Sequence, residues 1–378
     1  MTGSTSPAHE PVMPHPVVVR HALGSYPVYI EPGALVRLED MVNEHLPGRR
    51  VVTIADARVH QLYRTGRLGA EPWESETLTF EPGERSKTRE AWGRLTDEMV
   101  ERGLGRDCGL IALGGGVTGD LAGFVAATYM RGVPYLQVPT TLLAMLDASV
   151  GGKTGVNTPR GKNLVGAFHP PAAVIADPRT LHTLQEREYR GGLSEAVKHG
   201  LIADEAYFAW IEANAAALTR RDPATLSYLI RRSVEIKGVV VADDERESGR
   251  RAILNAGHTV AHALEQVSGY ELLHGEAVAL GLIVESQLAE ELGVAAPGLR
   301  SRVIRLLTSL GLPTQPPFTV QPEALIGTMA TDKKNRDGRI HFALVARVGA
   351  IYRANGWTTP VPVATVQAAL KVLREGKP

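Results

Sequence analysis

The sequence contains almost no cysteine, and this scarcity excludes one class of protein. Cys108 is the only cysteine in 378 residues, so no disulfide can form within the chain. This excludes a small secreted scaffold built on disulfides and fits a protein of a reducing compartment. A chain of this length corresponds to about two domains and can bury a large core without covalent cross-links.

The sequence also lacks an excess of either charge and long apolar runs. Lys+Arg and Asp+Glu both number 41, whereas proteins that neutralise nucleic-acid phosphates are usually basic, so we expect no nucleic-acid partner. No stretch of 18 apolar residues occurs, so we expect no transmembrane helix and no membrane association. Met1–Pro16 lacks the basic-then-apolar pattern of a signal peptide, which predicts a flexible N-terminal extension on a cytoplasmic protein.

Lysine is scarce relative to arginine. The chain has nine lysines and 32 arginines. A lysine kept against this bias indicates a position that needs a compact ammonium group, because the two side chains are not interchangeable at a tight site. Chance is the alternative explanation, but seven of the nine lysines fall in the segments discussed below.

The first half of the sequence alternates predicted strands with predicted helices. Short apolar, β-branched runs end at glycine or polar residues, as is typical of buried parallel strands. This alternation predicts an α/β domain with a Rossmann-like parallel sheet and helices on its faces. The predicted strands are Arg50–Ala55, Gly109–Leu113, Tyr135–Val138 and Ala172–Ala176, and a helix is predicted over Asp120–Tyr129.

After about Leu181 the pattern becomes mainly helical. We therefore predict a flexible extension over 1–16, an α/β domain over 17–180 and an α-helical domain over 181–378, with the cleft between the domains as the default site. One later strand is predicted at Ile340–Val348. The predicted helices are Glu188–Ile202, Glu205–Leu218, Pro223–Val241, Asn255–Val267, His274–Leu292 and Leu299–Leu310.

A glycine motif lies between a predicted strand and a predicted helix. Gly114, Gly116 and Gly119 fit G-x-G-x-x-G in the context that dinucleotide binding requires. Glycines let the backbone approach a pyrophosphate, and the helix N-terminus supplies N–H donors. A tight strand–helix turn is the alternative. Because the expected downstream acid is not clearly present, Asp56 is a candidate for the ribose hydroxyls, which indicates NAD in a non-standard topology.

Histidines and one carboxylate form a candidate metal site. His258 and His262 are spaced i, i+4 and share a helix face, while His274 and Glu195 lie on neighbouring predicted helices. Two imidazoles and one carboxylate would make a three-ligand catalytic zinc site with positions left for substrate. Helix capping or core packing by these residues is the alternative. Thr259 follows His258, so the HExxH motif of zincin proteases is absent.

Several cations lie beside glycine, asparagine or aspartate and not on regular amphipathic faces. Convergent cations suit an anionic substrate with a carboxylate at one end and a phosphate at the other. Solvated surface charge is the alternative for any single one. The residues are Arg131, Lys153, Lys162, Lys198, Lys237, Arg251, Lys333 and Lys334.

Four long segments together resemble the 3-dehydroquinate synthases of the sugar-phosphate cyclase family. They occur in the family's order, and the similarity runs over nearly the whole chain. The segments are Gly114–Arg131, Val138–Asn163, Gly192–Gly200 and Arg251–Glu265. The resemblance implies a dehydroquinate synthase-like fold, a homodimer, bound NAD and a divalent metal, zinc or cobalt.

The implied reaction belongs to the shikimate pathway. It converts 3-deoxy-D-arabino-heptulosonate 7-phosphate to 3-dehydroquinate and phosphate. The implied sequence of steps is transient oxidation by NAD, β-elimination of phosphate, re-reduction and an intramolecular aldol closure.

The resemblance also assigns residues. It implies Glu195, His258 and His274 as metal ligands. It places NAD against Asp56, Glu84, Lys87, Gly115, Gly116, Asp120, Thr140, Thr141, Lys153 and Lys162. It places substrate against Asp147, Lys153, Asn163, Lys198, Lys237, Arg251, Asn255 and His262, of which all but Asp147 are implied as catalytic. Arg131 from a neighbouring subunit and one of Lys333 and Lys334 would hold the phosphate.

Some motif residues depart from the family's usual ones, and two rival functions remain. Val260, Ala261 and His199 stand where the family usually has Phe, Gly and Tyr. One rival is a sister cyclase of the 2-epi-5-epi-valiolone or 2-deoxy-scyllo-inosose synthase type. The other is a metal-dependent polyol dehydrogenase, which would release NADH.

Overall fold

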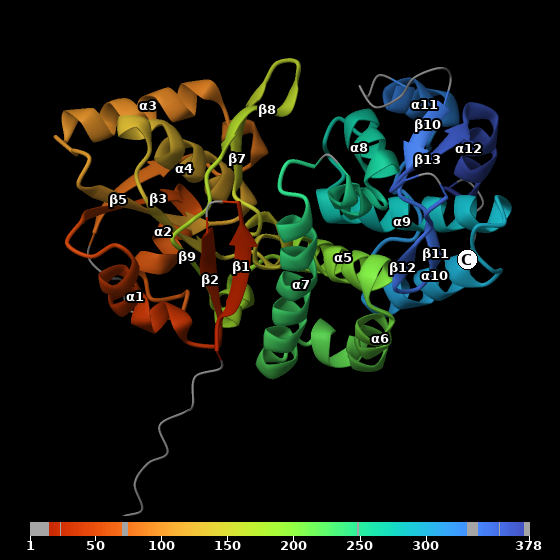
Figure 1. Cartoon of the computed structure of the whole chain (residues 1–378), viewed down its shortest axis with the longest axis horizontal. Helices are drawn as coiled ribbons and strands as arrows, with labels where there is room; N and C mark the ends of the chain where they lie inside the picture. The colour runs from red at the N-terminus through yellow and green to blue at the C-terminus, as the bar shows by residue number, and fades with distance from the viewer. Residues whose placement is uncertain are drawn as a thin grey trace, which may run out of the picture.

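The computed structural model describes residues 15–22, 24–69, 75–247, 249–330, 339–354 and 356–373. Figure 1 shows a half built on a β-sheet beside a half built mainly of helices, with the chain passing from the first to the second. This arrangement confirms the predicted fold class. Most of the predicted N-terminal extension, residues 1–14, lies outside the described residues.

The first half contains a seven-stranded sheet. The outermost pair, β1 and β2, is antiparallel, and every other pair is parallel. All four predicted strands are present, whereas β1, β2 and β4 were not predicted because their residues alternate between buried and exposed. The order is β1 (Val17–His21), β2 (Gly24–Ile30), β9 (Ala173–Ala176), β6 (Tyr135–Pro139), β5 (Cys108–Gly114), β3 (Arg50–Asp56) and β4 (Glu76–Phe80).

Helices cover both faces of this sheet (Figure 1). Val51 and Ala55 of β3 pack with helices on one face, and Val52 and Ile54 pack with helices on the other. Both sides of the strand are therefore apolar, which explains its uninterrupted hydrophobic run. The first face carries α1 (Leu38–His45) and α2 (Ala57–Arg64), and the second carries α3 (Arg89–Glu101) and α4 (Gly116–Thr128).

The strand order has a topological switch point between β3 and β5. The chain leaves β3 toward β4 on one side and leaves β5 toward β6 on the other. Such a switch point is where open α/β sheets bind their ligands. Helix α4 begins at Gly116, four residues before its predicted start, so most of the glycine motif forms the first turn of the helix.

The second half is built around a central helix, α9, that is buried over most of its length. The six predicted helices are all present. Helix α8 begins at His258 and not at Asn255, because Gly257 adopts a φ of 80° and starts the helix there. The helices are α5 (Glu186–Ala203), α6 (Glu205–Thr219), α7 (Pro223–Asp243), α8 (His258–Val267), α9 (His274–Glu291), α10 (Leu299–Ser309), α11 (Pro322–Ala330) and α12 (Val363–Ala369).

The prediction of a single strand over Ile340–Val348 is wrong. The structure divides this run into β10 (Arg339–Phe342), which pairs with β13 (Thr359–Pro362), and β11 (Val345–Arg347), which pairs with β12 (Ala350–Ile351). Ala343 and Leu344 between them are buried but belong to no strand. A run of apolar residues indicates burial but not strand pairing. Here the residues stay buried beyond the point where the pairing of β10 ends.

The two halves share packing across the predicted boundary. The largest core cluster combines Val19 and Val28 of the sheet with Val197 of α5 and Val234 of α7. A hairpin, β7 (Lys153–Thr158) and β8 (Gly161–Phe168), packs on α4 and projects beyond the sheet beside the second half (Figure 1). Short 3-10 helices occupy Ala34–Arg37, Glu84–Ser86, Tyr129–Arg131, Pro178–Thr183, Arg250–Asn255 and Leu370–Leu373, and Ala144–Ala148 is a π-helical turn.

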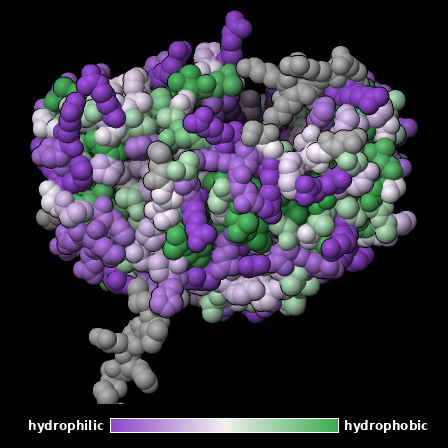
Figure 2. All heavy atoms as spheres, in the orientation of Figure 1, coloured by the Kyte–Doolittle hydropathy of each residue, from purple (hydrophilic) through white to green (hydrophobic). Residues whose placement is uncertain are grey.

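The surface in Figure 2 mixes hydrophilic and hydrophobic residues over both halves. Hydrophobic residues appear there in separate areas between hydrophilic ones. Among the described helices, none has the length and apolar character needed to span a bilayer.

Candidate active site

Three predicted metal ligands meet in the second half of the chain. The Nε2 atoms of His258 and His274 each lie 3.6 Å from Oε1 of Glu195. One ligand atom from each of the three residues lies within 4.8 Å of the ligand atoms of the other two. The carboxylate is fully buried, while the imidazoles are partly open, so one side of the cluster is accessible to a ligand.

Close contacts between glycines bring these ligands together. Helices α5 and α9 cross so tightly that a Cβ on Gly275 would lie 2.0 Å from the Gly191 carbonyl oxygen. Glu195 follows Gly191 by one helical turn, and His274 precedes Gly275. A Cβ on Gly281 of α9 would likewise lie 1.9 Å from the carbonyl oxygen of Gly257, which precedes His258. The ligand positions therefore depend on backbone contacts that only glycine permits.

The Nδ1 atoms of both histidines face acceptors. Nδ1 of His258 lies 3.2 Å from the Ala256 carbonyl oxygen, and Nδ1 of His274 lies 3.4 Å from Oε2 of Glu265. An acceptor at Nδ1 favours a proton there and leaves the Nε2 lone pair for a metal. Burial, followed by the charge of Lys198, lowers the pKa of His258 to about 3. Although burial opposes it, Glu195 and Glu265 raise the pKa of His274 to about 9.

The environment of Glu195 fits a bound cation. Both carboxylate oxygens are buried; Oε2 pairs with Lys198, and Oε1 faces Nε2 of both histidines. Burial alone would raise the pKa of Glu195, but Lys198 and His258 hold it well below its usual value, so the group is charged. A buried carboxylate with one oxygen directed at two imidazoles matches the donor set of a three-ligand zinc or cobalt site.

Buried cations surround the neighbouring carboxylate of Asp147. This residue lies in the π-helical turn and forms an ion pair with Lys237, while Lys198 Nζ lies 4.0 Å from Oδ2. Lys198 also pairs with Glu195. Burial lowers the pKa of Lys237 and would lower that of Lys198, but Glu195 and Asp147 raise the latter. Two buried lysines thus lie beside Asp147, and Lys198 also contacts the candidate ligand Glu195.

Polar contacts also join the glycine-rich segment around Lys153 to the loop that follows α7. Glu247 accepts from Lys153 Nζ at 2.5 Å and from the Asn255 amide at 3.2 Å. Arg251 is buried, and its guanidinium donates to the Glu245 carbonyl at 2.6 Å. A Cβ on Gly151 would lie 2.7 Å from that guanidinium, so Arg251 reaches the backbone of the Lys153 segment.

Most of the predicted NAD contacts lie near the carboxyl ends of β3, β5 and β6. Asp56 caps α2 after β3, and Gly115 is the N-cap residue of α4 after β5 and provides no side-chain cap, which leaves N–H donors for a ligand. Lys87 is buried, and its Nζ lies 2.8 Å from Asp120 and 3.1 Å from Glu84. Gly116, Thr140 and Thr141 complete this edge.

Four predicted site residues lie away from the cluster formed by Glu195, His258 and His274 or at its exposed edge. His262 is exposed on α8 with its ring centroid 5.5 Å from that of His258. Asn163 and Arg131 are exposed, and no described residue forms an ion pair with Arg131. Lys162 of the hairpin contacts Glu265 at 3.0 Å and not the NAD edge. Lys333 and Lys334 lie outside the described residues.

The sequence predictions missed several carboxylates of this region. Glu265 follows His258 by seven residues and His262 by three, so helical spacing places it on the same face and could have identified it. Glu247 lies in a loop and carries no comparable signal. Glu265 also completes a second set of candidate ligands with His262 and His274.

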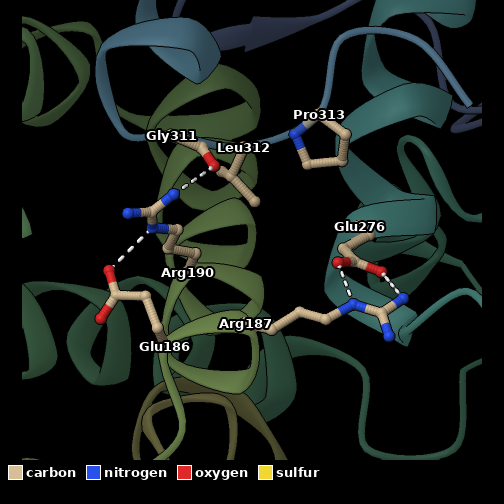
Figure 3. A pocket seen from close by; sticks show the side chains of 7 residues that line it. All are labelled: Glu186, Arg187, Arg190, Glu276, Gly311, Leu312 and Pro313. Atoms are coloured by element: carbon tan, nitrogen blue, oxygen red, sulfur yellow. Dashed lines mark hydrogen bonds and ion pairs between the residues drawn. The ribbon is translucent and has the colours of Figure 1, made fainter. Parts of the chain in front are cut away.

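A surface pocket of about 430 Å³ lies where α5, the start of α9 and the segment after α10 meet (Figure 3). Its charged residues are paired: Arg190 with Glu186, and Arg187 with both oxygens of Glu276. Glu276 also accepts from the Leu273 N–H at 2.9 Å and so caps α9 beside His274. The ion pair between Arg187 and Glu276 at this pocket therefore joins α5 and α9, the two helices that carry Glu195 and His274.

Removal of this cap should lower stability. We expect Glu276→Ala to reduce the free energy of unfolding by about 1–2 kcal/mol, mainly through the lost helix cap, since Arg187 is half exposed. Urea denaturation of the metal-free protein measures the change. Arg187→Lys keeps the cap and should cost less. Equal losses in the two variants would contradict a role for the cap.

A buried acid beneath the start of α8 should make stability depend on pH. Glu285 accepts from the Gly257 N–H at 2.7 Å, and burial raises its pKa to about 8. A raised folded-state pKa gives stability that is present below the unfolded-state pKa near 4.5 and is lost as pH rises through 8. We expect Glu285→Gln to become increasingly more stable than wild type from pH 5 to pH 8. Denaturation curves at both values test this, with the exposed Glu291→Gln as control; an unchanged difference would refute it.

Two family models match the chain. They are described as 3-dehydroquinate synthase N-terminal, over residues 77–191, and 3-dehydroquinate synthase C-terminal, over residues 192–335. A 3-dehydroquinate synthase of Halorhodospira halophila is 49% identical over 327 residues, which cover 86% of this chain and 91% of the relative. This chain belongs to the 3-dehydroquinate synthase family.

Solved structures agree with this membership. A 2-deoxy-scyllo-inosose synthase complexed with carbaglucose-6-phosphate, NAD+ and Co2+ has a TM-score of 0.86 at 26% identity, over 96% of this chain and all of the other. A 2-epi-5-epi-valiolone synthase from Streptomyces hygroscopicus subsp. jinggangensis, with NAD+ and Zn2+ bound, has a TM-score of 0.81 at 31% identity, over 93% and 97%.

The departures from the usual residues of the 3-dehydroquinate synthase family are all buried beside the ligands. Val260 and Ala261 lie on α8 between His258 and His262, and His199 follows Lys198. Burial lowers the pKa of His199 to about 3, so this imidazole is neutral beside Asp147. The substitutions therefore leave the charges of the ligand cluster unchanged.

Proposed function

We propose that this chain catalyses the 3-dehydroquinate synthase reaction, in which 3-deoxy-D-arabino-heptulosonate 7-phosphate becomes 3-dehydroquinate and phosphate. The observation that carries the proposal is the buried Glu195 carboxylate between the Nε2 atoms of His258 and His274, in a chain of this family. The reaction belongs to the shikimate pathway of aromatic amino acid biosynthesis. The balanced charge and single cysteine fit a cytoplasmic enzyme with a small anionic substrate.

The chain uses NAD and a divalent metal, zinc or cobalt. When bound, the metal acts as a Lewis acid on substrate oxygens, and NAD takes up and returns a hydride. Glu195, His258 and His274 would hold the metal. NAD would lie at the carboxyl ends of β3 and β5, against Asp56 and Gly115.

Buried cations orient the anionic substrate. Lys198 and Lys237 lie within reach of Asp147, so their positions are fixed before substrate arrives. We assign Lys237, Arg251 and Lys153 to the carboxylate and hydroxyls of the substrate, and Asn255 with Lys198 to its orientation beside the metal ligands. Groups already fixed in place reduce the entropy lost on reaching the transition state. Asn163, on the exposed hairpin, would also contact substrate.

Proton transfer is assigned to His262. It stands one turn after His258 on the accessible face of α8, so it can exchange protons with solvent and substrate. Departure of phosphate requires removal of a proton next to the newly formed ketone. The oxygens of the departing phosphate are themselves suitable bases for that step. The later ring opening and aldol closure require protons to move between oxygens, which one relay histidine can serve.

One activity assay that follows three signals together tests the function. The purified protein is incubated with the heptulosonate phosphate, NAD and zinc or cobalt, while phosphate, carbocyclic product and NADH absorbance are followed together. We expect equal amounts of phosphate and 3-dehydroquinate and no net NADH. Net NADH would indicate a dehydrogenase. Phosphate release only from sedoheptulose 7-phosphate or glucose 6-phosphate would indicate a sister cyclase.

We further propose a homodimer in which Arg131 reaches the partner's site. Arg131 is exposed at a φ of 67°, next to the exposed Met130 at a φ of 50°, and no described residue forms an ion pair with it. A strained, exposed arginine suits a ligand or a second subunit. It would hold the phosphate with Lys333 or Lys334.

Subunit complementation tests the placement of Arg131. We expect Arg131→Ala and Lys198→Ala to be separately inactive. When the two are mixed, unfolded and refolded together, heterodimers carry one intact site and about a quarter of wild-type activity returns. If Arg131 serves its own subunit, no heterodimer has a complete site and activity does not return.

A further inference from the structure

One buried carboxylate joins the hairpin to the candidate metal site. Glu265 lies near the end of α8, and its side chain is only 6% exposed. Its Oε1 lies 3.0 Å from Lys162 Nζ on the hairpin, and its Oε2 lies 3.4 Å from Nδ1 of His274. A residue outside the predicted site is thus shared by a ligand histidine and a cation from the other half of the chain.

We propose that Glu265 is a positioning residue that fixes the imidazole of His274 with Nε2 toward the metal, and that Lys162 fixes Glu265 in turn. The metal site is thereby coupled to the β7–β8 hairpin. The inference rests on the metal site of the proposed function but assigns a residue that the proposed reaction does not use. Carboxylates that accept from the second ring nitrogen of a ligand histidine set its orientation and raise its basicity.

The contacts of Lys162 support its role as the anchor of Glu265. Its ammonium lies 4.5 Å from the centroid of Tyr270, which follows α8, so two contacts hold it against the second half. The hairpin stands beside α8 in Figure 1. Because Glu265 is buried, losing this cation would leave its charge partly unbalanced.

The same contacts explain why Glu265 should not itself bind the metal. Glu265, His262 and His274 form the second candidate ligand set, and both sets need His274. Each carboxylate pairs with a lysine through one oxygen, Glu265 with Lys162 and Glu195 with Lys198. The other oxygen of Glu195 faces Nε2 of both histidines, whereas the other oxygen of Glu265 faces Nδ1 of His274. This geometry favours the metal at Glu195, beside the Nε2 atoms, and keeps Glu265 as an outer acceptor held by Lys162.

Substitution by glutamine separates shape from charge. A carboxylate accepts at both oxygens, but an amide accepts at one end and donates at the other. Glu265→Gln must therefore turn its NH2 toward either the Lys162 ammonium or the His274 N–H. We expect its zinc affinity to fall by about tenfold to a hundredfold. Glu212→Gln is the matched control, since it breaks the Arg302 pair elsewhere in the same half.

The test is made on metal-free protein without NAD or substrate. Zinc affinity is measured by competition with a chromophoric chelator, and the visible spectrum of the cobalt form reports ligand geometry. We expect Glu265→Gln to bind zinc more weakly with an altered cobalt spectrum, and Glu212→Gln to match wild type in both. Wild-type affinity and spectrum in a folded Glu265→Gln protein would overturn the proposal.

A second variant tests the link to the hairpin and does not depend on the folding of the first. Lys162→Met is expected to weaken zinc binding less than Glu265→Gln, and to add nothing in the double variant. Arg160→Met, at an exposed cation of the same hairpin, is the control. Wild-type affinity in Lys162→Met, or additive effects in the double variant, would overturn the coupling. Because no substrate is present, failure of the cyclase assay alone would not affect this result.

Discussion

Replacing His258 by alanine is expected to remove tight zinc binding and nearly all turnover. Among the residues that the structure describes, it supplies one of the two imidazoles whose Nε2 faces Glu195, at 3.6 Å from that carboxylate. Lewis-acid stabilisation is worth several kcal/mol, so kcat/KM should fall by roughly a thousandfold or more. Metal content after dialysis and steady-state phosphate release measure the two effects separately.

The control for this variant is His182→Ala. His182 is exposed in a 3-10 helix and forms no part of the ligand cluster. We expect its metal content and turnover to match wild type. A His258→Ala protein that retained stoichiometric zinc and wild-type kcat would show that this histidine is not a ligand.

Gly275→Ala is expected to damage both folding and metal binding. The added methyl would lie 2.0 Å from the Gly191 carbonyl oxygen, and backbone cannot rotate away as a side chain can. Overpacking of this kind costs about 1–3 kcal/mol, or more where the helices cannot separate. Since Glu195 and His274 flank the crossing, forcing α5 from α9 also separates two ligands. Urea denaturation and zinc competition measure the two consequences.

Gly327→Ala is the matched control for the crossing. Gly327 is also helical, but a Cβ there would meet no atom within 4 Å. Alanine should raise the free energy of unfolding by about 0.5–1 kcal/mol through helix propensity. If Gly275→Ala were equally harmless, helix packing at this point would not position the ligands.

The ligands could be predicted because their signals are local in the sequence. His258 and His262 have helical spacing, and the buried strands before Asp56 and Gly115 are uninterrupted apolar runs. Such patterns can be detected in the sequence without knowledge of tertiary contacts. Glu195 was already a candidate ligand, and the family resemblance then selected His258 and His274 from the three histidines, which spacing alone could not do.

The remaining features depend on contacts between distant segments. The glycine crossing of α5 and α9 involves Gly191 and Gly275, and neither has a local signal that names its partner. The contact of Lys162 with Glu265 joins residues 103 positions apart. The end of β10 at Phe342 could not be predicted from the sequence either, because Ala343 and Leu344 are apolar and as buried as the strands around them.

The central claim is that Glu195, His258 and His274 hold the metal. Anomalous diffraction at the zinc edge, from crystals of the zinc-loaded protein, tests it most directly. We expect a single peak at about 2.0–2.2 Å from a Glu195 oxygen and from Nε2 of both histidines. A peak bound instead by His262, Glu265 and His274 would contradict the assignment and the role given to Lys162.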